Sequence, residues 1–305
     1  MKYIAIFLII TVSCAFAISE SAGTAEMTFL KMAFSPRDAS LGNATVGFAD
    51  GPHGMFANPA GIAFEKKLSV ASSYNRLYVD INAGDIVAQK DLGVGHLGIG
   101  ARFVSYGEMD ETDASGNVIG SFSSSDIAVS AAFAREIVDD LAVGISPFFA
   151  ITNIADYSAY AVGADFGLLY RFDRGRGRAG IAVKNAGALF SDSNVEETLP
   201  LTACGGASYR LQGLPLYFMS QLDYSVDSEL SGGFGIEIIQ FKPLYVRAGY
   251  RIRPRISGEL AEGEELNGLS GGFGLEFDEF HVDYSLEHYG VLGLTHKFGL
   301  AYDGF

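Results

Sequence analysis

The chain changes character at Asp50-Gly-Pro-His-Gly-Met-Phe-Ala-Asn-Pro-Ala-Gly-Ile-Ala63. Before this stretch the sequence is irregular, and after it apolar and polar residues alternate as far as Phe305. Pro59 fixes its own φ and disfavours a helical conformation at Asn58, whereas Gly61 frees the backbone again. These residues, Asn58-Pro59-Ala60-Gly61, therefore indicate a junction between a plug and a barrel. An ordinary tight turn is the alternative interpretation.

The alternation after the junction has the two-residue period of β-strands. In Gly93–Tyr106, for example, Leu97 and Phe103 lie on one face, and His96 and Arg102 lie on the other. We count about fourteen such segments, each near the roughly ten residues that a tilted membrane strand requires. The predicted strands cover residues 67–76, 79–90, 92–106, 123–136, 139–153, 157–172, 177–187, 199–210, 214–226, 229–239, 242–252, 266–277, 279–289 and 293–303.

The connections between these strands alternate in length. Long loops on one rim and short turns on the other are typical of outer-membrane barrels, and an even strand number leaves both termini on one side. The sequence therefore predicts an all-β fold, a transmembrane antiparallel β-barrel of about 14 strands with an N-terminal hatch segment. The short links are predicted at 138–140, 211–213, 240–241 and 290–291, and the long polar ones at Glu108–Ser121, Leu189–Thr198 and Arg253–Glu265.

Composition supports a membrane location. The 305 residues include 38 Gly and no Trp, and the formal net charge is −15. No basic cluster is present, so nucleic acid is excluded as a partner. A mean hydropathy of +0.22 is high for so acidic a chain, and it fits a protein whose apolar surface faces outer-membrane lipid. A soluble β-sandwich, which would bury that apolar face, is the alternative fold.

The first residues, Met1–Ala17, have the features of a secretory signal, with Lys2 before an apolar run and Ala15-Phe16-Ala17 as the cleavage site. Cys14 offers the alternative of a lipoprotein cysteine, although Thr11 stands where such sites carry Leu. No later apolar run is long enough for a membrane helix. We therefore expect a signal peptide at 1–17, a hatch segment at 18–64 and an outer-membrane barrel at 65–305 of a bacterial envelope protein.

Strand phase predicts which side chains face lipid and which face the lumen. Phe103, Phe133, Phe166 and Phe234 lie on the apolar faces and should contact lipid. The aromatic residues near proposed strand ends are expected to form interfacial girdles. The polar faces should line the lumen with Arg102, Asp126, Asp165, Arg171, Glu237, Arg247, Arg251, Glu276 and Asp283.

The segment Met27–Phe64 is too short to fold alone and needs a larger body to dock on. We expect it inside the barrel, with Asn58-Pro59-Ala60 as its hinge to the first strand. Within it, Thr24–Phe34 has the apolar spacing of a short helix, which Ser35-Pro36-Arg37-Asp38 should break. Four lumen arginines should then pair with Asp38 or Asp50: Arg102, Arg171, Arg247 and Arg251.

No catalytic constellation is present among the residues that usually form one. None of the five histidines lies in a recognisable nucleophile motif, and Cys204 is too isolated for a disulfide or a zinc site. His281, Asp283 and Glu287 could converge on a metal, but a polar lumen explains them more simply. We therefore expect no enzyme, no cofactor and no metal.

Several of these residues resemble the opening of a known family. Phe29-Leu30-Lys31-Met32, Ser35–Ala44, Ala49-Asp50 and Asn58–Ala63 are similar to the start of the PorV/PorQ family. Those barrels are similar to the long-chain fatty acid transporter (FadL) family. The resemblance implies a fourteen-stranded barrel with an N-terminal hatch, and its Asn-Pro-Ala motif corresponds to Asn58, Pro59 and Ala60.

The function implied by the resemblance is a component of protein secretion (type IX-like) or of envelope assembly, with other secretion proteins as partners. The alternative is a FadL-like channel for long-chain fatty acids or other hydrophobic small molecules. An apolar pocket under the hatch would favour the channel, and a blocked lumen would favour the secretion component. An outer-membrane enzyme is the third class, and it lacks a nucleophile.

Overall fold

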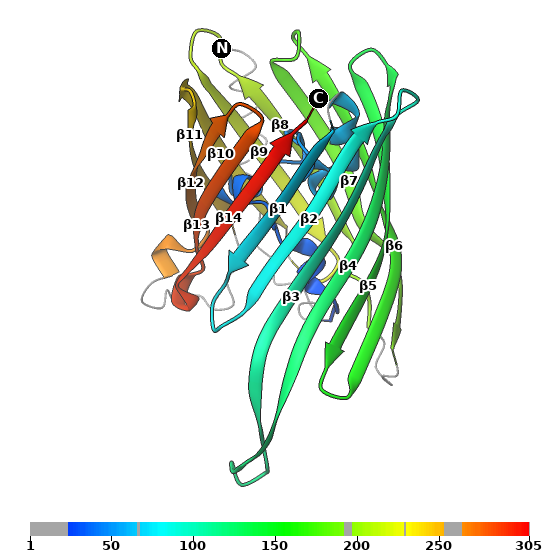
Figure 1. The fold of residues 1–305 in the computed structure, drawn as a ribbon, viewed down its shortest axis with the longest axis vertical. Coiled ribbons are helices and arrows are strands. Elements are labelled where there is room, and N and C mark those ends of the chain that lie inside the picture. The colour runs from blue at the N-terminus through cyan, green and yellow to red at the C-terminus, as the bar shows by residue number, and fades with distance from the viewer. Residues whose placement is uncertain (1–23, 66–67, 192–196, 229, 253–263, 305) are drawn as a thin grey trace.

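The computed structural model describes residues 24–65, 68–191, 197–228, 230–252 and 264–304. Its strands form one closed antiparallel barrel, in which each strand pairs with its neighbours in sequence and β1 pairs with β14 (Figure 1). This confirms the predicted fold class. The fourteen strands are β1 Ser69–Arg76, β2 Asn82–Asp91, β3 His96–Thr112, β4 Val118–Val138, β5 Leu141–Ile154, β6 Tyr157–Phe172, β7 Gly177–Ser191, β8 Thr202–Arg210, β9 Leu216–Ser225, β10 Ser231–Phe241, β11 Leu244–Ile252, β12 Leu269–Phe277, β13 Phe280–His288 and β14 Leu294–Asp303.

The two rims of the barrel differ. One rim, here the turn rim, carries the short β4–β5 and β10–β11 links and the paired strand ends Ser69 and Asp303. The other, here the hairpin rim, carries the β3–β4 connection. In outer-membrane barrels the short turns face the periplasm. The link at 290–291 joins β13 to β14, so it lies on the hairpin rim, and its predicted place among the short turns is wrong.

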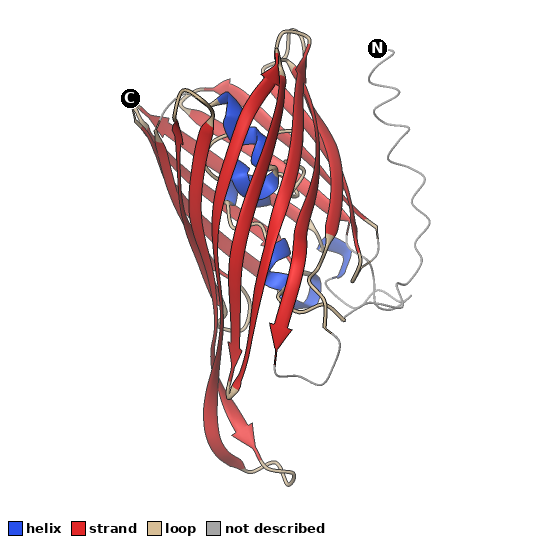
Figure 2. Cartoon of the chain, turned by 90° about the vertical axis from the view of Figure 1, so that its right-hand side faces the viewer, coloured by secondary structure: helices blue, strands red, loops and turns tan. Residues whose placement is uncertain are grey.

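The β3–β4 hairpin projects far beyond the rest of the hairpin rim (Figures 1 and 2). The predicted loop Glu108–Ser121 is instead mostly paired strand, and pairing continues to Thr112 and Val118. A strand pair outside the membrane needs no apolar face, so strand phase could not reveal it. The Asp113 carboxylate closes the turn by accepting hydrogen bonds from the backbone N–H groups of Ser115 and Asn117. The other long loops, and the signal segment, fall largely outside the described residues.

The outer surface is apolar, as the strand phase predicts. Phe103, Phe133 and Phe166 are 44, 40 and 47% exposed, and Phe234 lies half-buried in phase with exposed Ile236. Stacked aromatic pairs such as Tyr170 and Phe172 lie near the turn rim. So large an exposed apolar surface requires a lipid environment, and a closed barrel with this surface is an outer-membrane protein. In the described part of the chain, no helix is long and apolar enough to cross a membrane.

Residues Thr24–Glu65, here the inner segment, lie inside the ring of strands (Figure 2). The inner segment contains the short helices η1 Thr28–Lys31, α2 Pro36–Ser40, α3 Gly54–Ala57 and η2 Pro59–Phe64. Of the predicted helix Thr24–Phe34 only η1 forms, and it ends at Lys31, before Ser35-Pro36; the sequence analysis did not predict that a new helix, α2, begins at Pro36. Proline suits the first helical turn, and the Ser35 hydroxyl accepts a hydrogen bond from the Asp38 backbone N–H. The role of the segment as a hatch stays a prediction.

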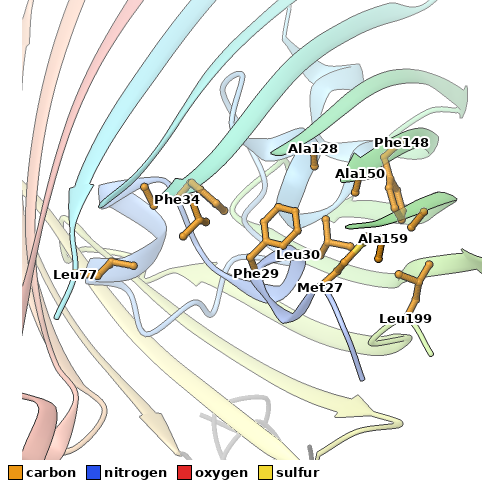
Figure 3. Packing of buried hydrophobic residues seen from close by; sticks show 13 residues of the cluster. Met27, Phe29, Leu30, Phe34, Leu77, Ala128, Phe148, Ala150, Ala159 and Leu199 are labelled. Atoms are coloured by element: carbon orange, nitrogen blue, oxygen red, sulfur yellow. The ribbon is translucent and has the colours of Figure 1, made fainter. Parts of the chain in front are cut away.

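The first part of the inner segment packs on an apolar patch of the wall. Met27, Phe29, Leu30 and Phe34 are buried in one cluster, and the first three lie beside small residues of β4–β6 (Figure 3). The wall side of this cluster consists mainly of Ala83, Val104, Ala128, Ala150, Ala159 and Ala161. Removing a large side chain of this kind from water contributes about 1.5–3 kcal/mol.

Candidate functional site in the barrel lumen

Asn58 joins the inner segment to the wall. Its side chain is fully buried and caps η2, because Oδ1 accepts a hydrogen bond from the Ala60 N–H at 3.1 Å. Nδ2 donates to the Val46 carbonyl at 3.0 Å and to the Leu168 carbonyl of β6 at 3.1 Å. Pro59 then occupies the first helical position of η2. At the predicted junction the chain therefore changes direction, and hydrogen bonds of Asn58 also attach the inner segment to the wall.

Two wall glycines let the inner segment approach this closely. A Cβ at Gly167 would lie 2.0 Å from Asn58 Oδ1, and a Cβ at Gly180 would lie 2.2 Å from the Val46 carbonyl oxygen. Any side chain at either position would therefore displace the segment. The close contact between the inner segment and the wall depends on glycine at these two positions. The sequence alone does not show this dependence, because it does not reveal which segment packs against the glycines.

The structure brings the predicted lumen residues to the inside of the barrel or to its edge. Arg102 stacks on Phe56 at 4.6 Å, and Arg171 stacks on Phe64 at 3.8 Å, so both contact the inner segment. Asp126 accepts hydrogen bonds from Thr152 and Tyr106 at 2.6 Å, Asp165 accepts from the Asn185 N–H at 2.7 Å, and Glu276 accepts from Tyr245. The buried members are Arg102, Asp126, Asp165, Glu237 and Arg247, and the half-buried ones are Arg171, Arg251, Glu276 and Asp283.

The predicted ion pairs of the inner segment are wrong. Asp50 pairs with Arg37 of α2 and, at 3.1 Å, with Arg178 of β7, rather than with any of the four arginines named from the sequence. Asp38 forms no ion pair within the described part of the chain. Arg171 pairs instead with Glu136 and Asp140, and Arg251 pairs with Asp223 at 2.8 Å. The sequence analysis missed Arg37 and Arg178, although Arg178 has the same strand phase as inward-facing Gly180.

Six charged side chains form one continuous row of ion pairs across the lumen, here the charge chain. Arg37 contacts Asp50 and, at 3.3 Å, Glu237; Glu237 contacts Arg247 at 2.7 Å. Ion pairs at the two ends bring in Arg178 and Asp283. Burial alone would raise the pKa of Asp50, but Arg37 and Arg178 lower it below its usual value. In order across the lumen, the charge chain is Arg178, Asp50, Arg37, Glu237, Arg247 and Asp283.

A cavity of about 180 Å³ lies between the inner segment and the wall formed by β7–β11. The inner segment lines it with apolar Met32, Phe34 and Phe56 and with three titratable residues, Lys31, Asp38 and His53. The wall lines it with polar side chains only. These include Lys184, Asn185, Thr202, Gln221, Asp223, Ser225, Ser231 and Arg251.

Three ionisable groups of the cavity stand out. The Lys184 ammonium group makes no hydrogen bond or ion pair with any residue that the structure describes. Burial raises the pKa of Asp38 from 3.8 to about 6. Burial alone would lower the pKa of His53, but the Asp85 carboxylate, 2.9 Å away, raises it overall. The cavity therefore contains an acid, Asp38, that changes charge at a pH of about 6.

The side chains weighed as a metal site separate in the structure. His281 pairs with Asp303 at 3.1 Å, and Asp283 joins the charge chain. Glu287 lies 3.5 Å from Lys297. Among the described residues, no group of three or more His, Cys, Asp or Glu side chains could hold a metal ion.

No protein-family model matches the chain, and no curated protein matches it. Solved structures do. The chain is similar to the Pseudomonas putida toluene transporter TodX, with a TM-score of 0.59 and 11% identity over 87% of this chain and 95% of that one. It is also similar to a Pseudomonas aeruginosa FadL homologue, with a TM-score of 0.58 and 11% identity over 96% of this chain and 100% of that one.

A variant of TodX described as a monoaromatic hydrocarbon channel matches with a TM-score of 0.59 and 13% identity, over 89% of this chain and 99% of that one. At such low identity the likeness concerns the fold alone. The chain thus has the outer-membrane barrel fold that is also found in FadL-like transporters and channels.

Proposed function

We propose that this protein is an outer-membrane channel for small amphipathic molecules, which develops the FadL-like alternative of the sequence analysis. The cavity between the inner segment and the polar wall carries the proposal. Its volume of about 180 Å³ is close to the ~150 Å³ of an engineered protein cavity that takes up benzene. The fold shared with the toluene transporter and the FadL homologue supports the same class of function.

The lining favours an amphipathic compound over a pure hydrocarbon. Phe34 and Phe56 offer apolar contact on one side, while Lys184 and Arg251 face the cavity from the other. A wholly apolar ligand would strip water from these cations without replacing its hydrogen bonds, which is costly. A ligand with one hydrogen-bonding group satisfies both sides. This departs from the mainly apolar pocket that the sequence analysis expected of a transporter.

Secretion remains the competing prediction. It rests on the resemblance of the N-terminal residues to the PorV/PorQ family, and none of the solved structures described above is a secretion component. A filled lumen fits an anchor as well as a closed channel. The cavity is the observation that favours the channel.

Uptake of two matched compounds tests the proposal. Cells that produce the protein should take up radiolabelled p-cresol faster than cells with an empty vector, and the gain for toluene should be smaller. The two compounds differ only by a hydroxyl group, so the comparison isolates the polar requirement. Substitution Lys184→Met should reduce the gain for p-cresol. Equal p-cresol uptake with and without the protein would contradict the channel.

Deletion of Ala25–Ala57 tests whether the inner segment closes the lumen. The remaining barrel should still insert and should conduct far more current in planar bilayers than the full chain. Barrels of about fourteen strands are wider than the small ones that side chains can fill. A deletion barrel that conducts no more than the full chain would mean that the external loops close the lumen.

A further inference from the structure

The charge chain lies across the route from the cavity to the turn rim. Strands β7, β10 and β11 contribute to both features. On each of these strands the residue that lines the cavity lies nearer the hairpin rim than the residue that belongs to the charge chain. The cavity and charge-chain residues are Lys184 and Arg178 on β7, Ser231 and Glu237 on β10, and Arg251 and Arg247 on β11. These offsets of four or six residues correspond to about 13–20 Å along the strand. A solute that leaves the cavity toward the periplasm therefore meets the charge chain next.

The row of ion pairs connects the inner segment to opposite parts of the wall. Arg37 and Asp50 belong to the inner segment, Arg178 belongs to β7, and Asp283 belongs to β13. The Phe48 ring packs against the guanidinium groups of Arg37 and Arg178, at 4.5 and 5.2 Å from its centroid. Phe48 therefore covers the half of the row that begins at Arg178.

The charges in this row balance. Three arginines alternate with three carboxylates, and each carboxylate contacts at least one arginine. A row without net charge attracts neither cations nor anions. Because its arginines and carboxylates are already paired with one another, none of them is free to replace the water around a passing ion. Charged rings in channels select ions by their net sign. Removing one member therefore gives the row a net sign and a free partner.

We propose that the charge chain is the selectivity barrier of the lumen, and that its balance of arginines and carboxylates disfavours the passage of small inorganic ions of either sign. The inference rests on the proposed channel function. It assigns a barrier role to Arg37, Asp50 and Arg178, which face each other only because the inner segment is seated in the barrel.

Two substitutions of opposite sign test the barrier. Arg37→Ala leaves a net negative row, and Asp50→Asn leaves a net positive one. In planar bilayers under a KCl gradient, the permeability ratio of K⁺ to Cl⁻ should rise at least threefold in Arg37→Ala and fall at least threefold in Asp50→Asn. The reference is Arg37→Lys, which keeps the charge and should keep the ratio of the unaltered protein.

The matched control is Arg176→Ala. Arg176 pairs with Asp173 at 2.6 Å in the β6–β7 turn, so this substitution removes the same charge outside the charge chain. It should leave the permeability ratio unchanged. A heat-dependent shift in gel mobility checks that every variant has closed its barrel. A merely structural loss would loosen the segment in both lumen variants and move their ratios in the same direction.

The deletion of Ala25–Ala57 separates the two proposals. If the deletion barrel conducts while Arg37→Ala and Asp50→Asn keep the ratio of Arg37→Lys, the charge chain is not the barrier and the channel proposal stands. Equal shifts of the same sign in both variants would also overturn the barrier. A deletion barrel that conducts no more than the full chain would mean that the external loops close the lumen, and the charge chain would then not be the barrier.

Discussion

The two sides of the lumen differ at the same height in the barrel. Toward the hairpin rim, β2–β6 present Ala83, Val104, Ala128, Ala150 and Ala161 to the inner segment. At the same level β7–β11 present side chains such as Thr202, Asp223, Ser231 and Arg251 to a cavity. Small apolar residues let the segment pack without a gap, whereas polar residues retain water. The inner segment therefore packs tightly on the side formed by β2–β6, here the alanine wall. The cavity lies between the segment and the side formed by β7–β11, here the polar wall.

The strongest test of this contrast truncates a large side chain of the inner segment that packs on the alanine wall. Phe29 is 1% exposed, and Phe29→Ala should lower the free energy of unfolding in bilayers by about 3–5 kcal/mol, because it leaves a cavity that the alanines cannot fill. The matched change on the polar wall, Ser231→Ala, should cost less than about 0.5 kcal/mol. Reversible refolding in lipid bilayers measures both. Similar costs on the two walls would remove the contrast.

The outer face should show no such contrast, because lipid covers it on every side. Phe166 points outward from β6 and is 47% exposed. Phe166→Arg should lower the free energy of unfolding by about 2–4 kcal/mol if the position lies near the bilayer midplane. The same refolding assay applies, with Phe166→Leu as the control. A cost below about 0.5 kcal/mol would place Phe166 away from lipid.

Asn58 links the inner segment to the wall. Replacing its side chain should lower the free energy of unfolding by less than replacing that of Phe29. Substitution Asn58→Ala leaves the Val46 and Leu168 carbonyls and the Ala60 N–H without this partner. A buried group left unsatisfied costs about 1–3 kcal/mol. Limited proteolysis should then cut the inner segment faster, while the strands stay resistant. Asn75→Ala, which alters another buried wall amide, should leave the segment protected.

The smallest expected effect is a pH dependence at the cavity. Because the folded-state pKa of Asp38 is raised from 3.8 to about 6, its ionisation is harder in the folded protein than in the unfolded chain. Stability should therefore fall as the pH rises through that window. Asp38→Asn imitates the protonated acid and should be the more stable protein above the window, with the difference vanishing below it. Thermal unfolding of both proteins at a series of pH values measures this difference. If their stabilities change with pH in parallel, Asp38 is not the source of the pH dependence.

Strand phase was sufficient to predict the barrel because the membrane allows few alternative arrangements of a spanning strand. Each strand must alternate between lipid and lumen, and the predicted segment 157–172 coincides with β6. The β3–β4 hairpin was underestimated because beyond the membrane that constraint disappears. Helix α2 was missed because Pro36 can either end a helix or begin one, and the Ser35 cap decides between the two.

The lumen was harder to predict than the wall. Strand phase located Arg102 and Arg247 on the inner face, yet it could not supply their partners, because those depend on how the inner segment folds against the wall. Arg37 is the clearest case. It is one charge in a short polar stretch of sequence, and only the three-dimensional approach of Asp50 and Glu237 shows its place in the charge chain.

The contact between Asn58 and the glycines of the wall has a consequence for biogenesis. The segment fits against Gly167 and Gly180 with no side chain between them, while neighbouring Leu169 projects inward and is fully buried. Such a segment could not slide into place from an open end of a finished cylinder. The ring is closed by the pairing of β14 with β1. We therefore expect the inner segment to take its place before the pairing of β14 with β1 closes the ring, and we expect the wall to assemble around the segment.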